Sequence, residues 1–354
     1  MQTFEWIFVL VFLAGLVYAE DEKKEAAADL RVVETVLLYQ RSSGGWPKNY
    51  DRQQRLTVAE QAEVLAEKDK HDSTIDNGAT YTEVRLLTNA YHSTVDDRFR
   101  QAVLRGIAYL LDAQYDNGGW PQYFPPRRNG YSRHITFNDN AMIGVMSLLR
   151  DVTNDKIQFS FVPRTTRYQC QQAFERGIDC ILKCQIVIKG IPTVWCAQHD
   201  EVTFEPRPAR SYELASLSGS ESVGIVRLLM QVDQPNDAIV HAIESAGAWF
   251  EQSKLMGRKQ VRIEDPSQPT GFDKVVIKDP NASPMWARFY DMETGQPIFC
   301  SRDGIPRQTL VEISHERRNG YSWLGHYARQ LLDRDFPAWL SRMEKKRGPK
   351  MSGE

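Results

Sequence analysis

Two short clusters of acids and amides are the first residues in this sequence that could do chemistry. Asp76 and Asn77 are adjacent, and Asn138, Asp139 and Asn140 form a second run further along the chain. Any one of these residues alone is typical of a helix N-cap. As a pair of clusters they offer the carboxylate and amide oxygens that a hard cation such as calcium prefers. The chain contains no EF-hand loop, so a calcium site would be assembled from distant segments or shared with a substrate.

Residues 204–213 (FEPRPARSYE) place two arginines in a loop rather than in a helix. Pro206 and Pro208 rule out a regular helix there, and they hold Arg207 and Arg210 on a restricted backbone. The two arginines suit an anionic ligand. A capped surface loop with a solvated ion pair is an equally good interpretation.

Residues 284–304 combine arginine with aromatic residues. Apolar and polar residues alternate around a turn, which predicts a short β-hairpin with Trp286, Arg288 and Tyr290 on one face. Arg302 follows in the second half of the segment. Arginine binds carboxylates through paired hydrogen bonds, and aromatic rings can stack on sugar rings. The segment therefore indicates a site for a polymer of sugar acids.

The charge balance argues against general nucleic-acid binding, because the formal net charge is -2 and nucleic-acid binders usually carry a clear basic surplus. Arginine is nevertheless concentrated locally. The local groups are Arg127, Arg128 and Arg133; Arg207 and Arg210; Arg288 and Arg302; and Arg317 and Arg318. In a nearly neutral protein such groups fit a localised anion-binding cleft, although solvated surface arginines are the usual interpretation.

The elements that must position these residues are indicated by an internal repeat. Residues 105–114 (RGIAYLLDAQ) recur as residues 176–185 (RGIDCILKCQ), and fainter copies end at Gln40 and Gln252. Gln40 and Gln114 each lead to Gly-Gly-Trp-Pro, whereas the loop after Gln185 is degenerate. Gly-Gly before Trp-Pro cannot continue a helix, so each copy predicts a helix that ends in a glycine cap and a loop.

A second helix follows each loop. Three segments that begin at Asp76, Asn138 and Ser218 each end in Leu-Leu, and the second and third are apolar around most of their circumference. The predicted unit is an outer helix, a long loop and an inner helix. Three units in a ring predict an all-α fold, an (α/α)3 toroid with a short β-hairpin, whose long loops and inner-helix N-termini line one cleft. The periodicity alone also fits an all-α repeat scaffold that only binds a partner.

The start of the chain differs from the rest. Residues 6–19 (WIFVLVFLAGLVYA) form an apolar run that is too short to span a bilayer comfortably, and residues 17–19 resemble a cleavage site. We therefore expect a signal peptide over residues 1–19, one catalytic domain over residues 20–345 and a polar tail over residues 346–354. The mature chain is expected to be secreted or periplasmic, without a membrane segment, and monomeric.

Several motifs together resemble a known family. GGWP occurs twice, and it is accompanied by DNGAT, HITFNDNAM, PRPARSYELASLSGSESVGIVRLLM, WARFYDMETGQPIF, SRDG and ERRNGY. In number and order these motifs resemble the all-helical pectate lyases, polysaccharide lyase family 10, over roughly residues 28–335. The resemblance implies an (α/α)3 toroid, calcium dependence and endo-type attack on unesterified polygalacturonate.

The same resemblance implies roles for individual residues. Arg302 in SRDG resembles the family's catalytic base, and Arg288 and Arg210 resemble its substrate-binding arginines. Asp139 in FNDNAM resembles the calcium ligand, and Asp76 in TIDNGAT matches an active-site aspartate that we expect to share the metal and the substrate. The further expected substrate contacts are Asn77, Trp286 and Tyr290. The chain departs from the family at Pro208, near a position where a lysine is frequent, so one subsite contact differs.

The implied reaction removes the proton on C5, next to the uronate carboxylate, and expels the sugar oxygen on C4. Calcium held by Asp139 and Asp76 would offset the developing charge, and Arg288 and Arg210 would add fixed positive charge. Arginine is an awkward base, because its reference pKa is about 12.5–13.8. Calcium and neighbouring arginines are expected to lower the pKa of Arg302, which predicts an alkaline optimum. In an alternative, Arg302 only stabilises charge and water acts as the base.

Two functions of other classes remain open at this point. The first is an inverting glycoside hydrolase on the same toroid, which would use two carboxylates such as Asp76 and Glu221. The second is a non-catalytic glycan-binding protein. The products distinguish them, because a lyase forms an unsaturated uronide that absorbs in the near ultraviolet. A hydrolase forms only new reducing ends, and a binding protein forms no product.

Overall fold

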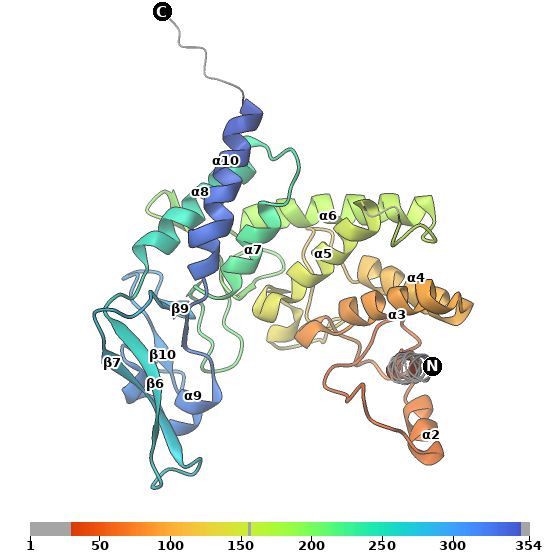
Figure 1. Ribbon diagram of the computed structural model, residues 1–354, viewed down its shortest axis with the longest axis horizontal. Helices are drawn as coiled ribbons and strands as arrows, with labels where there is room; N and C mark the ends of the chain where they lie inside the picture. Colours follow the sequence, from red (N-terminus) through yellow and green to blue (C-terminus); the bar gives the residue numbers. More distant parts are fainter. Residues whose placement is uncertain (1–29, 155–156, 348–354) are drawn as a thin grey trace, which may run out of the picture.

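The computed structural model describes residues 30–154 and 157–347, and this part of the chain is mostly helical (Figure 1). The predicted signal peptide lies outside the described residues, as does most of the predicted tail. Among the described helices, none combines the length and the apolar character that crossing a bilayer requires.

Helical hairpins form the body of the protein. Inner and outer helices pair as α3 with α4, α5 with α6, and α7 with α8, and the inner helices contact one another in chain order. The outer helices are residues 30–39, α4 (Asp97–Asp112), α6 (Arg164–Cys184) and α8 (Asp237–Gln252). The inner helices are α3 (Tyr81–Thr94), α5 (Ala141–Asn154) and α7 (Glu221–Leu229). In the described chain these pairs of helices follow one another from α3 and α4 to α8 and α10 (Phe336–Arg347) without closing into a barrel (Figure 1). The arrangement confirms the predicted all-α toroidal fold class.

The predicted repeat appears as a repeated set of hydrogen bonds. The side-chain amide of Gln40 donates to the carbonyl of Gly44 in its own loop and to the carbonyl of Ala102 in the next outer helix, both at 2.9 Å. Gln114 and Gln185 make the equivalent pairs of bonds. A buried indole N–H in each loop donates to the helix before it: Trp46 to Val36, Trp120 to Leu110 and Trp195 to Ile181. The loops are therefore anchored in the same way in each unit.

Glycine lets the inner helices approach closely. A Cβ atom on Gly144 of α5 would lie 2.2 Å from the ring of Tyr81 in α3. A Cβ atom on Gly224 of α7 would lie 2.0 Å from the side-chain oxygen of Asn140, which directly precedes α5. Both distances are far below a van der Waals contact, so a larger residue at either place would push two inner helices apart.

The β-structure differs from the expectation. The longest strands, β6 (Arg258–Glu264) and β7 (Phe272–Lys278), form an antiparallel hairpin that the sequence analysis did not predict, and this hairpin projects from the C-terminal half (Figure 1). Within residues 284–304, Tyr290 and Pro297 form an antiparallel bridge. The strands of that segment, however, pair with other parts of the chain: β8 (Trp286–Ala287) with β12 (Leu324–Gly325), and β9 (Phe289–Tyr290) with β5 (Leu217–Ser218).

The remaining elements are short or lie at the edges of the fold. The other two-residue strands are β1 (Ile135–Thr136) with β4 (Gln198–His199), β2 (Val187–Ile188) with β3 (Ile191–Pro192), and β10 (Phe299–Cys300) with β11 (Pro306–Arg307). The other helices are α2 (Val58–Ala66), α9 (His315–Gly320), the π-helical η5 (Leu331–Asp335) and α10 (Phe336–Arg347), with 3₁₀ turns η2 (Tyr131–Arg133) and η4 (Leu310–Glu312).

Candidate active site

Two tight turns carry the acid-amide clusters. The turns η1 (Asp76–Gly78) and η3 (Asn138–Asn140) are 3₁₀ helices that contact each other and precede α3 and α5. The interpretation of single residues in these clusters as N-caps of the inner helices was wrong, because the N-cap of α3 is Thr80, and Asn77 and Asp139 have positive φ angles of 51° and 50°. Asparagine and aspartate tolerate this left-handed backbone better than most residues. The sequence therefore builds two matching kinks rather than two caps.

Asp76 is held by a lysine that the sequence analysis did not identify. The Asp76 side chain is buried and forms an ion pair with Lys48, which follows the first Gly-Gly-Trp-Pro loop. Burial lowers the pKa of Lys48, but the hydrogen bond and the charge of Asp76, together with Tyr123, outweigh this effect and the net pKa is raised. The neighbouring Asn77 is exposed and donates from its side-chain amide to Asn49 at 2.9 Å. One loop thus engages both members of the first cluster.

Arg288 connects the second cluster to α7. Its Nη2 atom lies 3.0 Å from Asp139 Oδ1 and also forms an ion pair with Glu221. The side chains of Arg288 and Glu221 are buried, whereas 44% of the Asp139 side chain is exposed. Burial lowers the pKa of Arg288, but the charges of Glu221, Tyr321 and Asp139 outweigh it and the net pKa is raised. The Nε atom of Arg288 is buried and has no partner within the described chain.

Two tyrosines bring the three predicted arginines together. The ring centre of Tyr321 lies 4.8 Å from the Arg288 guanidinium carbon and 5.8 Å from that of Arg210. The ring centre of Tyr212 lies 5.0 Å from Arg210 and 5.7 Å from Arg302. Guanidinium groups are attracted to aromatic faces at such distances. The arginines and tyrosines therefore form one continuous series that starts at Asp139.

The carboxylate of Glu213 fixes the middle of this series. It accepts from Arg210 Nε at 2.7 Å and from the Tyr321 hydroxyl at 2.7 Å. Burial raises the pKa of Glu213, but these two hydrogen bonds outweigh it and the net pKa is lowered. An ionised, buried Glu213 keeps Arg210 next to Tyr321, and neither Glu213 nor the tyrosines were identified as site residues from the sequence.

Arg302 lies at the exposed end of the series. It donates to Glu316 through Nε at 3.2 Å and through Nη2 at 2.9 Å. The hydrogen bond and the charge of Glu316 raise the pKa of Arg302 and outweigh the lowering by the charge of Arg210. The expected lowering by calcium remains a prediction for the calcium-bound site. Hydrogen bonds from Arg317 and Arg302 in turn lower the pKa of Glu316 to about 2. Arg302 is therefore a paired cation in this structure.

Trp286 and Tyr290 do not line the site, which corrects the expectation that they stack on a sugar polymer. Both are 1% exposed and lie in the hydrophobic core. The Trp286 indole N–H donates to the carbonyl of Phe250 at 2.9 Å, and the Tyr290 hydroxyl donates to the carbonyl of Ser253 at 2.9 Å. Both carbonyls belong to the end of α8. Trp286 thus anchors a segment to the helix before it, as the three loop tryptophans do.

The carboxylate pair considered for hydrolysis is unsuited to that chemistry. Glu221 is 2% exposed, and its two oxygens are engaged by Arg288 and by the Ser218 hydroxyl. Asp76 is engaged by Lys48. An inverting hydrolase needs one carboxyl group that donates a proton and another that activates water. A buried carboxylate that is paired with a cation is held in its ionised form, so it does not readily donate a proton, and its oxygens are not free to activate water.

The oxygen donors around Asp139 suit a hard cation. Its carboxylate is partly exposed and accepts from the side-chain amide of Asn138 at 2.8 Å, and Asn138 and Asn140 flank it in the sequence. Among residues 30–154 and 157–347, the one group of three possible ligands with mutually close donor atoms is elsewhere, at His134, Asp200 and Glu201. The charges of that group are already compensated, since Glu201 pairs with Arg133 and Asp200 with Arg207. The charge of Asp139 is compensated in the same way, because Asp139 pairs with Arg288.

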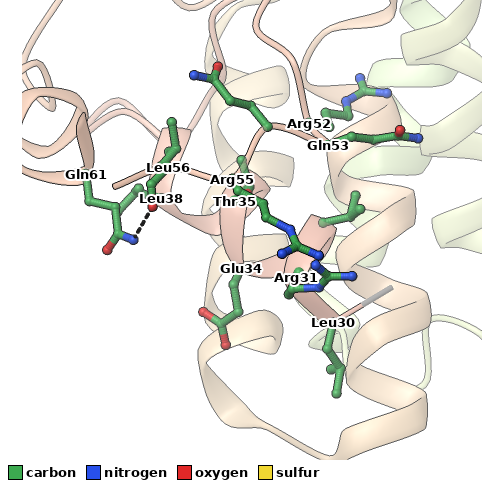
Figure 2. A pocket seen from close by; sticks show the side chains of 12 residues that line it. Leu30, Arg31, Glu34, Thr35, Leu38, Arg52, Gln53, Arg55, Leu56 and Gln61 are labelled. Carbon is green, nitrogen blue, oxygen red and sulfur yellow. Dashed lines mark hydrogen bonds between the residues drawn. The ribbon is translucent and has the colours of Figure 1, made fainter. Parts of the chain in front are cut away.

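A hollow of the described surface lies among residues other than those of the arginine series. It has a volume of about 760 Å³ and is lined by residues 30–38 and 52–61, among them Arg31, Arg52 and Arg55 (Figure 2). Arg52 is occupied by an ion pair with Glu83 of α3. None of the predicted site residues lines this hollow.

Comparison with known proteins identifies relatives that match most of the chain. The profile of a family described as pectic acid lyase matches residues 40–332. The structure is similar to a mutant of the family 10 polysaccharide lyase from Cellvibrio cellulosa in complex with trigalacturonic acid, with a TM-score of 0.75, 36% sequence identity and coverage of 85% of this chain and 90% of that one. It is also similar to a family 10 polysaccharide lyase from Cellvibrio cellulosa with a TM-score of 0.75, 35% identity and coverage of 87% and 92%. No curated protein sequence matches the chain.

Proposed function

Because this chain belongs to the pectic acid lyase family, and is thus a polysaccharide lyase, we propose that it cleaves α-1,4-polygalacturonate by calcium-assisted β-elimination with Arg302 as the base. The observation that carries the proposal is the contact series from Asp139 through Arg288, Arg210 and Arg302. A row of cations beside a half-exposed acid suits a polymer with one carboxylate on every sugar. The related lyase in complex with trigalacturonic acid supports this choice of substrate.

The residues of this chain would divide the reaction between them. Arg288 places a buried guanidinium, and thus a fixed positive charge, next to Asp139, and Arg210, whose side chain is 45% exposed, would bind a second carboxylate so that the polymer stays in register. Arg302 takes the proton from C5, the electron pair of that bond forms the C4–C5 double bond, and the glycosidic oxygen leaves C4. Fixed positive charge around the uronate stabilises the dianion that develops as the proton departs.

Arg302 must exchange its partner before it can act. In this structure its guanidinium donates to Glu316, and the same carboxylate also accepts from Arg317. Arg317 can keep its ion pair with Glu316 while the side chain of Arg302 rotates away. Both guanidinium groups lie over the ring of Tyr212, that of Arg317 at 4.4 Å from the ring centre and that of Arg302 at 5.7 Å. The base would thus be released by a side-chain rotation.

Calcium would be held by Asp139 and, together with the substrate, by Asp76. When bound, it supplies positive charge that offsets the carboxylate next to C5 and so makes that carbon more acidic. Lys48 and Arg288 pair with these two aspartates here, and Arg288 also pairs with Glu221, so that two cations meet three carboxylates and a further positive charge would be favourable. The expected export of the chain through residues 1–19 and its monomeric state belong to the same proposal.

The test is incubation of the purified protein with polygalacturonate at alkaline pH while absorbance in the near ultraviolet and reducing ends are both measured. The expected result is that the two signals rise together. Reducing ends without absorbance would mean hydrolysis, and binding without either signal would mean a glycan-binding protein.

A further inference from the structure

A second group of cations with an aromatic ring is connected to Asp76 through Lys48. The ring centre of Tyr123 is 4.0 Å from the guanidinium carbon of Arg127 and 5.8 Å from the ammonium of Lys48. Tyr123 is half-buried and Arg127 is exposed. The ring is therefore fixed, while the outer cation is accessible to a ligand.

This group is attached directly to the acidic turn η1. Tyr123 forms an antiparallel bridge with Thr74, two positions before Asp76, and the Thr74 hydroxyl bonds the carbonyl of Gln122. Lys48 contacts the ring of Tyr123 and also pairs with Asp76. A chain of contacts thus runs from Arg127 through Tyr123 and Lys48 to Asp76.

The two acidic turns join this chain to the arginine series. Turn η1 contacts turn η3, and Asp139 of η3 pairs with Arg288. Contacts therefore lead from the two acidic turns to two groups of cations and tyrosines: Tyr321 and Tyr212 with three arginines are reached from Asp139, and Tyr123 with Lys48 and Arg127 is reached from Asp76. A polymer long enough to extend from one group to the other would contact both.

The outer charge is available for a ligand. Most arginines near the site are paired with carboxylates, as Arg210 is with Glu213 and Arg302 with Glu316. Arg127, in contrast, forms no ion pair with any residue of the described chain, and its contact is the face of Tyr123. Exposed arginine on an aromatic face retains its hydrogen-bonding capacity for a carboxylate.

We propose that Lys48, Tyr123 and Arg127 form a distal subsite that binds galacturonate residues remote from the bond that is cleaved, so that the enzyme prefers long chains. The proposal rests on the proposed function, since it takes polygalacturonate as the ligand. Tyr123 supplies a surface for a sugar ring, and Arg127 pairs with the carboxylate of that sugar. Short oligomers that fill the arginine series do not reach this group.

The experiment compares kcat/KM on polygalacturonate with kcat/KM on trigalacturonate for the full protein and two exposed arginine variants. Arg127→Ala should reduce the ratio of the two values about fivefold, the effect expected from one partly exposed cation and aromatic contact. Arg128→Ala is the matched control, because Arg128 is exposed in the same loop, has the same charge and makes no ring contact in the described chain. Equal ratios in the two variants would overturn the subsite.

A binding measurement separates this proposal from the proposed function. Electrophoresis in native gels that contain polygalacturonate should retard the wild-type protein and the Arg128→Ala variant more than the Arg127→Ala variant. If the three proteins were retarded in this order but the wild type formed no unsaturated product, β-elimination would be wrong and the subsite would stand. If product formed but Arg127→Ala were retarded as strongly as Arg128→Ala, the subsite would be wrong and β-elimination would stand.

Discussion

Arg302 donates two hydrogen bonds to Glu316, and the same carboxylate raises the pKa of the arginine that we propose as the base. A base must be neutral when it accepts a proton. The pairing therefore opposes the role, and the pH at which Arg302 can work depends on what happens to Glu316.

Replacing Glu316 should move activity toward lower pH. The carboxylate raises the pKa of Arg302, so Glu316→Gln lowers it and increases the neutral fraction at every pH below that pKa. The alkaline rise in kcat on polygalacturonate should then begin at a lower pH than in the parent. Glu293→Gln, which removes an exposed carboxylate from the turn after β9, is the control for net charge. An unchanged profile in Glu316→Gln would show that the titration of Arg302 does not limit turnover.

Arg302→Lys should lose most turnover and retain most binding. Lysine keeps the positive charge, and its reference pKa of about 10.4 is lower than that of arginine, so protonation alone would not disable it. It fails because one flexible ammonium cannot reproduce the planar guanidinium, and a misplacement of about 1 Å can cost about 10²-fold. The measurements are kcat at saturating polygalacturonate and affinity for oligogalacturonates from pH 7 to 11. Turnover within about threefold of the parent at every pH would remove Arg302 from the role of base.

The two substrate arginines should differ in their effect on stability. Arg288→Ala and Arg210→Ala should each weaken transition-state stabilisation by about 3–4 kcal/mol. Arg288→Ala also leaves Glu221 buried without its cation, which should cost about 3–5 kcal/mol in the free energy of unfolding. After Arg210→Ala, Glu213 keeps its hydrogen bond from Tyr321, so that variant should be the more stable of the two.

A second substitution separates folding from chemistry in this comparison. Adding Glu221→Gln to Arg288→Ala removes the unpaired charge and should restore much of the thermal stability, while turnover stays low. Recovery of turnover together with stability would mean that Arg288 is only structural.

Removal of calcium should abolish activity without unfolding the protein. Chelator should eliminate the absorbance change on polygalacturonate, and added calcium should restore it. Circular dichroism should show unchanged helix content, because Asp76 and Asp139 keep their ion pairs with Lys48 and Arg288 in the absence of an ion. Full activity after exhaustive chelation would contradict the metal assignment, and loss of helix would mean that these ion pairs are not sufficient to hold the two acidic turns.

The repeat could be predicted from sequence because its signals are local. Gly-Gly-Trp-Pro ends a helix, and a polar cluster followed by an apolar run ending in Leu-Leu begins the next. The long hairpin of β6 and β7 was missed, and the predicted hairpin over residues 284–304 was only partly right. A strand pattern does not tell which partner a strand will choose, and β8 and β9 pair with segments distant in the chain.

Residues of the candidate site could be predicted from the sequence only where the residue type by itself indicated the chemistry. The arginines and aspartates were found, but Lys48 and Tyr321 were not, because each acts through a partner that is far away in the sequence. Trp286 and Tyr290 were assigned wrongly for a related reason. Alternation indicates which side chains share a face, but only the tertiary structure decides whether that face is covered.

The side-chain amides of Gln40, Gln114 and Gln185 each join one repeat to the next. Gln114, for example, holds the carbonyl of Gly118 in its own loop and that of Ala173 in the following outer helix. Each of these loops is thus hydrogen-bonded to an outer helix that occurs later in the chain. A change in one outer helix is consequently transmitted backwards, to the loop of the preceding repeat, so that a substitution in α6 near Ala173 would disturb the loop that follows Gln114.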